Sequence, residues 1–380
     1  MSQSVLHCYA DYKWTGPSEP VAVLCRGLCR HGWRAELACA RLPAPGAGTL
    51  ARRAREMGIV VHDQFHFGGR PDLGRKLWDM DRLSRMIQNG GYAIVHVHGS
   101  WDHMVAAAAL DRSPCRVPLV RSDHGAHEYR GSLLERLQFG PRWTKHLIVL
   151  SDRLRVRAVD RLGLDPDTVT TVRGAVDVNG YRPMDAPPGV RERFGLGRED
   201  VVFGLVARVQ RHRRFEVLLK AALLVQQRDP RVRIVVLGRG SQREAVLDRP
   251  IKQMGLGDTV RPLGYLTGDY REALAMLDAG LMLVPGSDGS CRAALQMAAM
   301  GKPLLVADRG VLPDIVRDGE TGIVVHDTAD DLAGAILEMA QSADRRRQWG
   351  RAARERMEAF FSLDCQVRAV TGVYERLLEK

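Results

Sequence analysis

One stretch of the sequence decides the fold that we expect, and it reads Leu283-Val-Pro-Gly-Ser-Asp288-Gly-Ser-Cys-Arg-Ala-Ala-Leu-Gln296-Met-Ala-Ala-Met-Gly301-Lys-Pro-Leu-Leu-Val-Ala307. An apolar strand ends in a turn of small residues, and an Ala/Met-rich helix follows. Gly301 and Pro303 end that helix before a second apolar strand begins. Strand, loop, helix and strand make a parallel βαβ unit. Its loop places backbone N–H groups at a helix N-terminus, where an anionic ligand binds favourably.

Short apolar runs alternate with helical stretches along the rest of the chain, which predicts α/β domains with parallel sheets covered by helices. The expected helices include 215–228 and 242–254. The strands are expected at 4–8, 35–40, 60–61, 94–98, 119–121, 147–150 and 169–172, and then at 201–207, 233–237, 260–263, 280–284, 304–307 and 323–325. A Pro/Gly-rich stretch at 180–189 reads as a linker. We therefore expect doubly wound domains at 1–180 and 181–361, followed by a helix at 362–380.

The composition is that of a soluble globular protein, with 45% hydrophobic and 27% charged residues. The formal net charge is +11, but the arginines are dispersed, which disfavours nucleic acid and leaves phosphorylated small molecules or an anionic membrane as partners. The start of the chain lacks the pattern of a secretory signal, and no apolar run is long enough to span a bilayer. Seven scattered cysteines without a CxxC pair predict a reducing cytosol and no metal site.

One helical stretch has a pattern typical of a membrane surface. Leu73, Leu77, Met80 and Leu83 fall at helical spacing, and basic residues surround them at positions 70, 75, 76, 82 and 85. This is the pattern of an interfacial helix. An ordinary amphipathic helix packed on a sheet has the same spacing, so both interpretations stay open.

Several motifs occur in a fixed order and carry a family resemblance. They are Thr15-Gly16-Pro17-Ser18, His96-Val-His98-Gly99, Ser122-Asp-His124-Gly125, Val172-Arg-Gly-Ala-Val-Asp177, Ala207-Arg208-Val-Gln-Arg-His-Arg213-Arg214, Leu237-Gly-Arg-Gly240, Leu263-Gly264-Tyr265 and Gly319-Glu-Thr-Gly322. Together with the opening stretch they resemble the retaining glycosyltransferases of family four. The resemblance implies the GT-B fold, in which two Rossmann-like domains face a central cleft and the last helix crosses back to the N-terminal domain. The N-terminal domain would bind the acceptor and the C-terminal domain the nucleotide sugar.

The chain departs from the family at its acidic pair, because Asp288 and Gln296 stand where the family has Glu-x7-Glu. By resemblance, Asp288 accepts hydrogen bonds from sugar hydroxyls and Gln296 binds the ribose. Arg208 and Arg213 would hold the diphosphate, for which planar multi-donor guanidinium groups are suited. The competing interpretations are a helix residue without a ligand for Gln296 and a solvated arginine cluster for the two arginines.

The remaining expected site residues are small residues and histidines. Gly289, Ser290 and Cys291 would donate backbone N–H groups to the sugar or phosphate, unless they form a plain tight turn. The resemblance adds the donor-binding positions Gly16, Gly264 and Tyr265. It also places His124 at the reacting centre and His98 elsewhere in the cleft, although a lone histidine after a strand can be structural.

We therefore expect a cytoplasmic, retaining GT-B glycosyltransferase that moves a hexose-type sugar from a nucleoside diphosphate donor to a glycan or lipid-linked glycan. Bacterial cell-surface polysaccharide or lipopolysaccharide synthesis is the expected setting, with peripheral contact to the inner face of the cytoplasmic membrane. The resemblance implies no metal and no cofactor. The alternative is a non-catalytic GT-B protein that binds a glycan or steadies a partner transferase, which the loss of both glutamates favours.

Overall fold

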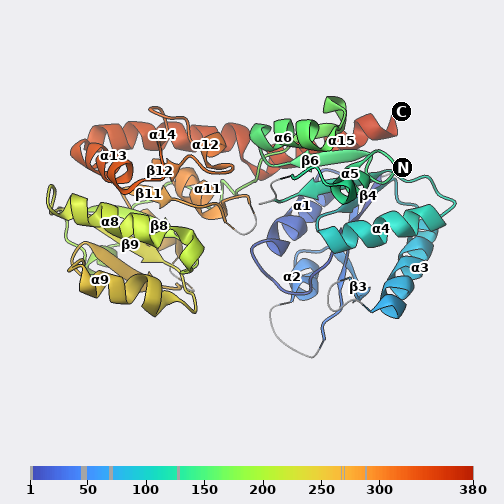
Figure 1. Cartoon of the computed structure of the whole chain (residues 1–380), viewed down its shortest axis with the longest axis horizontal. Helices are drawn as coiled ribbons and strands as arrows, with labels where there is room; N and C mark the ends of the chain where they lie inside the picture. The colour runs from blue at the N-terminus through green and yellow to red at the C-terminus, as the bar shows by residue number, and fades with distance from the viewer. Residues whose placement is uncertain are drawn as a thin grey trace. The chain divides into compact units, whose positions relative to one another are not determined.

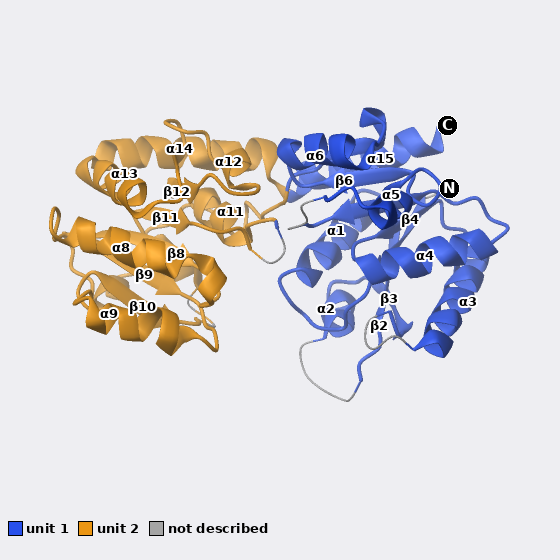
Figure 2. Cartoon of the chain, in the orientation of Figure 1, with its two compact units in different colours: residues 1–173, 287–289, 363–380 blue, residues 174–286, 290–362 orange. Residues whose placement is uncertain are grey.

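The computed structural model describes residues 3–43, 49–67, 72–125, 129–266, 268, 270–286 and 289–379. The chain forms two compact units (Figures 1 and 2). The first unit comprises Met1–Arg173, Ser287–Gly289 and Leu363–Lys380, and the second comprises Gly174–Gly286 and Ser290–Ser362. Each unit contains one fully parallel sheet with helices on both faces, so the predicted doubly wound α/β class is confirmed.

The first unit is built on a seven-stranded sheet in the order β3-β2-β1-β4-β5-β6-β7. Its strands are β1 (Ser4–Tyr9), β2 (Arg34–Ala40), β3 (Val60–Phe65), β4 (Ile94–Val97), β5 (Leu119–Asp123), β6 (His146–Val149) and β7 (Val169–Thr171). Its helices are α1 (Ser18–Arg30), α2 (Leu50–Glu56), α3 (Leu73–Gly90), α4 (Ser100–Arg112), α5 (Leu133–Phe139), α6 (Asp152–Leu162), the short η1 (Pro166–Thr168) and α15 (Leu363–Leu378).

The two faces of this sheet bury different cores, because successive strand residues point to opposite sides. Val5 faces a cluster formed with α1 and α15, in which Val370 and Tyr374 are fully buried. Leu6 faces a second cluster that includes Leu83 of α3 and residues of α4. The last helix therefore belongs to the core of the first unit.

The second unit is built on a six-stranded sheet in the order β10-β9-β8-β11-β12-β13. Its strands are β8 (Val201–Val206), β9 (Val232–Leu237), β10 (Val260–Gly264), β11 (Ala279–Met282), β12 (Leu304–Ala307) and β13 (Gly322–Val325). Its helices are α7 (Val190–Arg193), η2 (Arg211–Arg213), α8 (Phe215–Gln226), η3 (Glu244–Asp248), α9 (Arg249–Gln253), α10 (Tyr270–Ala275), α11 (Arg292–Ala299), α12 (Leu312–Ile315), α13 (Ala329–Gln341) and α14 (Ala343–Phe360).

The strand order has the same consequence in both units. The chain winds outward from β1 to β3 and then returns to place β4 beside β1, and it does the same from β8 to β10 before β11 pairs with β8. The carboxyl ends of β1 and β4, and those of β8 and β11, therefore flank a topological switch point. Ligands of open parallel sheets bind at such points.

One predicted helix has a different form in the structure. The sequence predicts a continuous helix over 242–254, but a π-helical turn, η3, precedes a short α9. Pro250 lies in the first turn of α9, where its missing N–H removes one backbone hydrogen bond and its ring conflicts with the carbonyl group four residues earlier. A wider π turn accommodates such a residue. Within the described ranges, no helix is both long and apolar enough to cross a bilayer.

Candidate active site

The switch point of the second unit carries both of the predicted site arginines. Arg208 follows β8 and is exposed. Arg213 lies in η2 and is almost fully buried, and its Nη1 donates a hydrogen bond to the carbonyl oxygen of Pro285 in the loop after β11. Arg213 therefore joins the two loops that flank the switch point, and it carries a positive charge into a largely desolvated position.

The loop after β8 is held rigidly against the loop after β9. The N–H of Val209 donates to the carbonyl of Arg239 over 3.2 Å, and the N–H of Arg211 donates to Oε1 of Gln242 over 2.9 Å. A Cβ atom at Gly240 would lie only 2.0 Å from the carbonyl oxygen of Val209, so this approach requires glycine. The fixed backbone places the arginines before any ligand arrives.

Two left-handed residues begin the helices at this switch point. Among the described residues, Arg214 (φ 62°) and Cys291 (φ 54°) are the non-glycine residues with positive φ. Arg214 precedes α8 and Cys291 precedes α11. The left-handed conformation costs roughly 1–2 kcal/mol for an L-residue, and such strain clusters at functional sites. The side chain of Cys291, the N-cap residue of α11, makes no capping hydrogen bond, and the helix dipole favours an anion at this end.

Ser290 has an unsatisfied polar atom beside this helix. The residue is buried, and its Oγ has no hydrogen-bond partner among the described residues. Gly174 allows the close approach, because a Cβ atom there would lie 2.8 Å from Cβ of Ser290. A buried hydroxyl without a partner costs free energy unless a ligand or water completes it. The sequence predicts that the backbone N–H of Ser290 contacts the sugar or phosphate, but the burial of its hydroxyl is apparent only in the structure.

The loop after β10 adds an aromatic side chain. Gly264 ends β10 with φ 75°, and its carbonyl oxygen accepts a 2.7 Å hydrogen bond from the N–H of Gly238. Tyr265 is exposed, and the guanidinium carbon of Arg239 lies 4.6 Å from the centroid of its ring. This cation–π pair was not predicted, although Arg239 lies within the Gly238-Arg239-Gly240 motif. Its exposed aromatic ring is a surface on which a planar ligand could stack.

Gln296 already has a protein partner. The hydroxyl of Tyr270 donates a 3.0 Å hydrogen bond to its Oε1, which leaves the amide NH₂ to act as the donor. Burial raises the pKa of Tyr270, so its hydroxyl stays protonated. The structure thus pairs the neutral side chain at this position with a tyrosine, a partner that motif spacing alone did not reveal.

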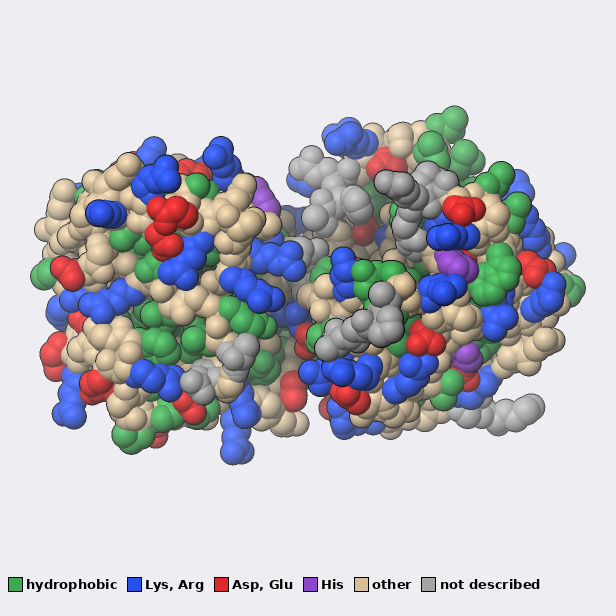
Figure 3. Space-filling model, turned by 90° about the horizontal axis from the view of Figure 1, so that it is seen from below, with side chains coloured by type: hydrophobic (Ala, Val, Ile, Leu, Met, Phe, Trp, Pro, Cys, Tyr) green, Lys and Arg blue, Asp and Glu red, His purple; other side chains and the backbone are tan. Residues whose placement is uncertain are grey.

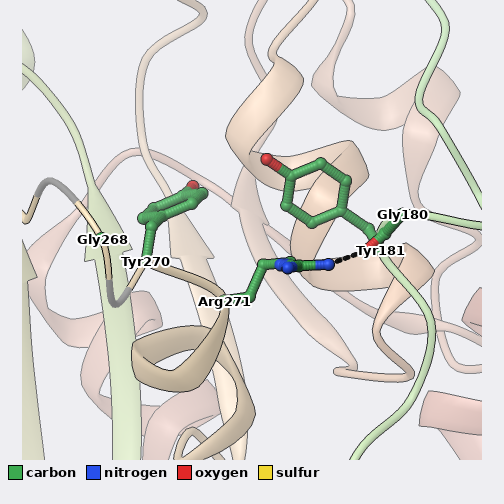
Figure 4. A pocket seen from close by; sticks show the side chains of 5 residues that line it. All are labelled: Gly180, Tyr181, Gly268, Tyr270 and Arg271. Atoms are coloured by element: carbon green, nitrogen blue, oxygen red, sulfur yellow. Dashed lines mark hydrogen bonds between the residues drawn. The ribbon is translucent and has the colours of Figure 1, made fainter.

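A pocket of about 390 Å³ lies beside this pair in the second unit (Figure 4), lined by Gly180, Tyr181, Gly268, Tyr270 and Arg271. The rings of Tyr181 and Tyr270 meet edge to face, with centroids 6.4 Å apart. Nη1 of Arg271 donates to the carbonyl of Gly180 over 3.2 Å, as the dashed line in the figure shows. The pocket therefore presents two aromatic rings and one guanidinium group.

The switch point of the first unit carries two of the predicted histidines. His98 directly follows β4 and His124 directly follows β5, and Nδ1 of His98 lies 2.9 Å from Nε2 of His124. Gly16 lies in the turn that begins α1. Gly289, which belongs to the same unit, has φ 65°, and a Cβ atom there would lie 2.2 Å from the carbonyl oxygen of His124. Only glycine fits this position.

More histidines lie beneath these two, and the sequence did not predict their role. His7 of β1 pairs with His96 of β4 in the sheet, and both side chains are fully buried. His96 contacts Tyr374 of α15 (Nδ1 to hydroxyl, 2.5 Å) and Ser122 (Nε2 to Oγ, 2.8 Å). Burial lowers the pKa of His7 to about 3 and that of His96 well below its ordinary value, so both rings are neutral.

Asp288 lies outside the described residues, so its proposed contact with the donor sugar stays a prediction. The structure brings His98, His124 and Gly289 together in the first unit. In the second unit it joins Arg213 to the loop after β11 and Gly264 to the loop after β9. The roles assigned to these residues likewise remain predictions.

Comparison with known proteins shows the family. Residues 16–179 match the profile described as Glycosyltransferase Family 4, and residues 190–356 match Glycosyl transferases group 1. The chain is 30% identical over 316 residues to the D-inositol 3-phosphate glycosyltransferase of Streptomyces scabiei, which covers 75% of this chain and 68% of that protein. It spans 61% of the length of the corresponding protein of Nocardia farcinica.

Solved structures share the fold at low sequence identity. A glycosyltransferase from Rickettsia africae superposes with a TM-score of 0.85 at 16% identity, covering 100% of this chain and 99% of that one. HepE of Anabaena, solved in complex with UDP-glucose, superposes with a TM-score of 0.78 at 17% identity, covering 98% and 99%. The predicted GT-B fold is therefore confirmed, and the chain belongs to the group 1 glycosyltransferases.

Proposed function

We propose that this protein transfers a hexose-type sugar, with retention of configuration, from a nucleoside diphosphate sugar to a hydroxyl group of an acceptor. The single observation that carries the proposal is the bridge from Arg213 to the Pro285 carbonyl, in the loop that leads to the N-terminus of α11. This arrangement offers a fixed positive field where a diphosphate would develop charge as it leaves. The UDP-glucose bound to HepE supports a donor of this class.

The chain's own residues supply positioning and electrostatic stabilisation in this mechanism. Arg208 and Arg213 would bind the diphosphate with charge-assisted hydrogen bonds, and the dipole of α11 would add to their effect. As the bond from sugar to phosphate breaks, the departing phosphate oxygen accepts the proton of the attacking hydroxyl on the same face of the sugar. Asp288 would hold a sugar hydroxyl, and Gln296 would donate its amide N–H to the ribose.

Two classes of acceptor fit the chain. We propose a glycan or a lipid-linked glycan of the bacterial cell surface as the acceptor. The relatives named D-inositol 3-phosphate glycosyltransferase favour a phosphorylated polyol as a second class. Both classes fit a chain with a net charge of +11. On the face that Figure 3 shows, the basic side chains are spread over both units and do not form one stripe.

The decisive experiment measures sugar transfer and donor hydrolysis with UDP-, GDP- and ADP-linked hexoses against inositol phosphate and short glycan acceptors. Asp288→Ala should abolish turnover, and Gln296→Glu should preserve or raise it by restoring the charge-assisted bond. The anomeric configuration of the product, read by NMR, tests retention. No transfer or hydrolysis with any donor by well-folded wild type would favour the alternative, a non-catalytic protein that binds a glycan or steadies a partner transferase.

We also propose a peripheral contact between α3 and an anionic membrane surface. Leu83 is buried in the core of the first unit, but Leu73 and Leu77 are 75% and 46% exposed. Lys76 lies between them in sequence, with its ammonium group 4.5 Å from the ring centroid of Trp101 on α4. Apolar side chains with basic neighbours match the chemistry of a negatively charged bilayer surface.

Vesicle flotation tests this contact. Wild type should float with vesicles containing phosphatidylglycerol and not with pure phosphatidylcholine, and Leu73→Gln with Leu77→Gln should weaken flotation. Exposed Val156→Gln on α6 serves as the control substitution. Equal flotation of wild type and the double variant would mean that α3 does not contact the membrane.

A further inference from the structure

A chain of three imidazoles runs inward from His124 in the first unit. Nε2 of His124 and Nδ1 of His98 are 2.9 Å apart, and Nε2 of His98 and Nδ1 of His7 are also 2.9 Å apart. Successive rings are nearly parallel, at 20° and 15°. We infer that His98 and His7 are positioning residues that hold His124 in one tautomer and one ring orientation. This rests on the proposed function and on the place at the reacting centre that the family resemblance implies for His124.

The chain fixes tautomers because its two buried rings, His7 and His98, are neutral. Burial lowers the pKa of His7 to about 3 and that of His98 well below the ordinary value, so each ring carries one proton at neutral pH. A hydrogen bond between two neutral imidazoles needs one N–H and one bare nitrogen. The tautomer of one ring therefore sets the tautomer of the next.

The buried end of the chain sets its direction. Nε2 of His7 is buried and has no hydrogen-bond partner among the described residues. Buried N–H groups without an acceptor are rarer than unsatisfied acceptors, so His7 carries its proton on Nδ1 and donates to His98. His98 in turn donates from Nδ1 to Nε2 of His124. His124 then carries its own proton on Nδ1.

This tautomer defines what His124 can do. Its Nε2 lone pair is occupied by His98, so the ring carries its N–H at Nδ1 and does not serve as a base through Nε2. A hydrogen-bond donor suits a donor sugar or its phosphate oxygen. In the proposed mechanism the departing phosphate takes the acceptor proton, so a histidine base is not needed.

The surroundings of His98 keep its ring from turning. The ring of His96 stacks on it with centroids 4.3 Å apart, and His96 is held by hydrogen bonds to Tyr374 and Ser122. The backbone N–H of His98 donates to Oδ2 of Asp102 over 2.7 Å. A support of this kind fixes a functional side chain before the ligand binds.

A metal ion is the competing occupant of this cluster. His7, His96 and His98 have potential ligand atoms within 4.8 Å of one another. Both nitrogens of His96 and both nitrogens of His98 are already engaged in hydrogen bonds. Ligation would have to break at least some of these bonds, so the hydrogen-bonded chain explains the observed geometry without a metal.

The test uses the full chain with ¹⁵N-labelled histidine, because two-bond ¹H–¹⁵N correlations distinguish the two neutral tautomers. Wild type at pH 7.5 should show His7, His98 and His124 protonated on Nδ1. His98→Leu should convert His124 to a mixture of tautomers. His98→Asn should restore the Nδ1–H form, because its amide N–H takes the place of Nδ1. His103→Leu, which removes another buried histidine of the first unit, should leave His124 unchanged.

The kinetic readout is separate from the spectra. With an active donor and acceptor, His98→Leu should lower kcat by about 10- to 100-fold through misplacement of His124, with little change in the acceptor KM, and His98→Asn should recover most of the loss. His124 protonated on Nε2 in wild type would overturn the inference, as would an unchanged His124 in His98→Leu or a stoichiometric bound metal.

The spectra need no substrate, so they test the tautomers independently of the transfer assay. A failed transfer assay would overturn the proposed function but would not change the tautomers that the spectra report. If His98→Leu does not fold, the wild-type and His98→Asn spectra still decide the question.

Discussion

The two units share a strand order but equip their switch points with opposite chemistry. In the first unit the polar groups include histidines joined in a hydrogen-bonded chain, of which burial keeps His7 and His98 neutral. In the second unit they are arginines on loops that lead to helix N-termini. One site is suited to orienting a neutral sugar, and the other is suited to binding an anion. The fold supplies the location in both units, and the side chains decide the ligand.

Low pH should unfold the first unit before the second, and this is the largest effect that we expect. The buried histidines among the described residues all lie in the first unit, and burial lowers the pKa of His7, His96, His98 and His103. The unfolded chain binds protons on these residues near pH 6.5, whereas the folded chain does so only at much lower pH. Between those values the unfolded state binds more protons, so stability falls as pH falls.

Each histidine can contribute up to about 1.4 kcal/mol per pH unit in this window, so the free energy of unfolding should fall by several kcal/mol between pH 6.5 and pH 5. Urea unfolding at a series of pH values measures the fall, and hydrogen exchange locates it. His7→Leu should make the pH dependence shallower. A loss of protection that begins in the second unit would contradict the comparison.

Replacement of Arg213 should damage both the structure and the site of the second unit. Arg213→Met leaves the Pro285 carbonyl without this charged donor, which should cost about 1–3 kcal/mol of stability. Affinity for the donor should fall as well. Exposed Arg208→Met is the matched control, and it should weaken donor binding without a change in melting temperature. Equal melting temperatures for the two variants would mean that the bridge to Pro285 does not stabilise the unit.

Tyr270→Phe should give the smallest effect, because it removes one hydrogen bond and keeps the ring. It frees Oε1 of Gln296, and the expected loss of stability is about 1 kcal/mol. Donor affinity should fall only a few-fold, since the amide loses its orientation and keeps its chemistry. Titration calorimetry compares the donor affinity of Tyr270→Phe with that of Tyr181→Phe, which retains the edge-to-face contact. A larger loss of donor affinity in Tyr181→Phe than in Tyr270→Phe would mean that the hydroxyl of Tyr181, and not that of Tyr270, supports the ligand.

The sequence predicted each of the thirteen strands that the structure describes, because buried parallel strands are short apolar runs between helical stretches and this pattern is local. It also predicted the positions of Arg208 and His124 after strands. The histidine chain could not be predicted from the sequence. It depends on the pairing of His7 with His96 and on Tyr374, which lies 278 positions from His96 in the sequence. The bond from Tyr270 to Gln296 likewise depends on how α10 packs near α11, which no local pattern reveals.

The π turn before α9 has a local cause, unlike the histidine chain. Apolar periodicity predicted a helix over 242–254, and Pro250 is the local residue that changes its form. Asp288 lies outside the described residues, so the sequence remains the only basis for its role.

Binding of UDP, GDP and ADP to wild type, Arg208→Ala and Arg211→Ala, measured by isothermal titration calorimetry, tests the central claim most directly. Arg208 and Arg211 are both exposed arginines of the same loop, but only Arg208 is expected to meet the diphosphate. We predict that wild type binds at least one of the three nucleotides. Arg208→Ala should lose about 1.5–3 kcal/mol of binding free energy at an unchanged melting temperature, and Arg211→Ala should lose little. No binding by wild type, or equal losses in both variants, would contradict the assignment of the anion site to this switch point.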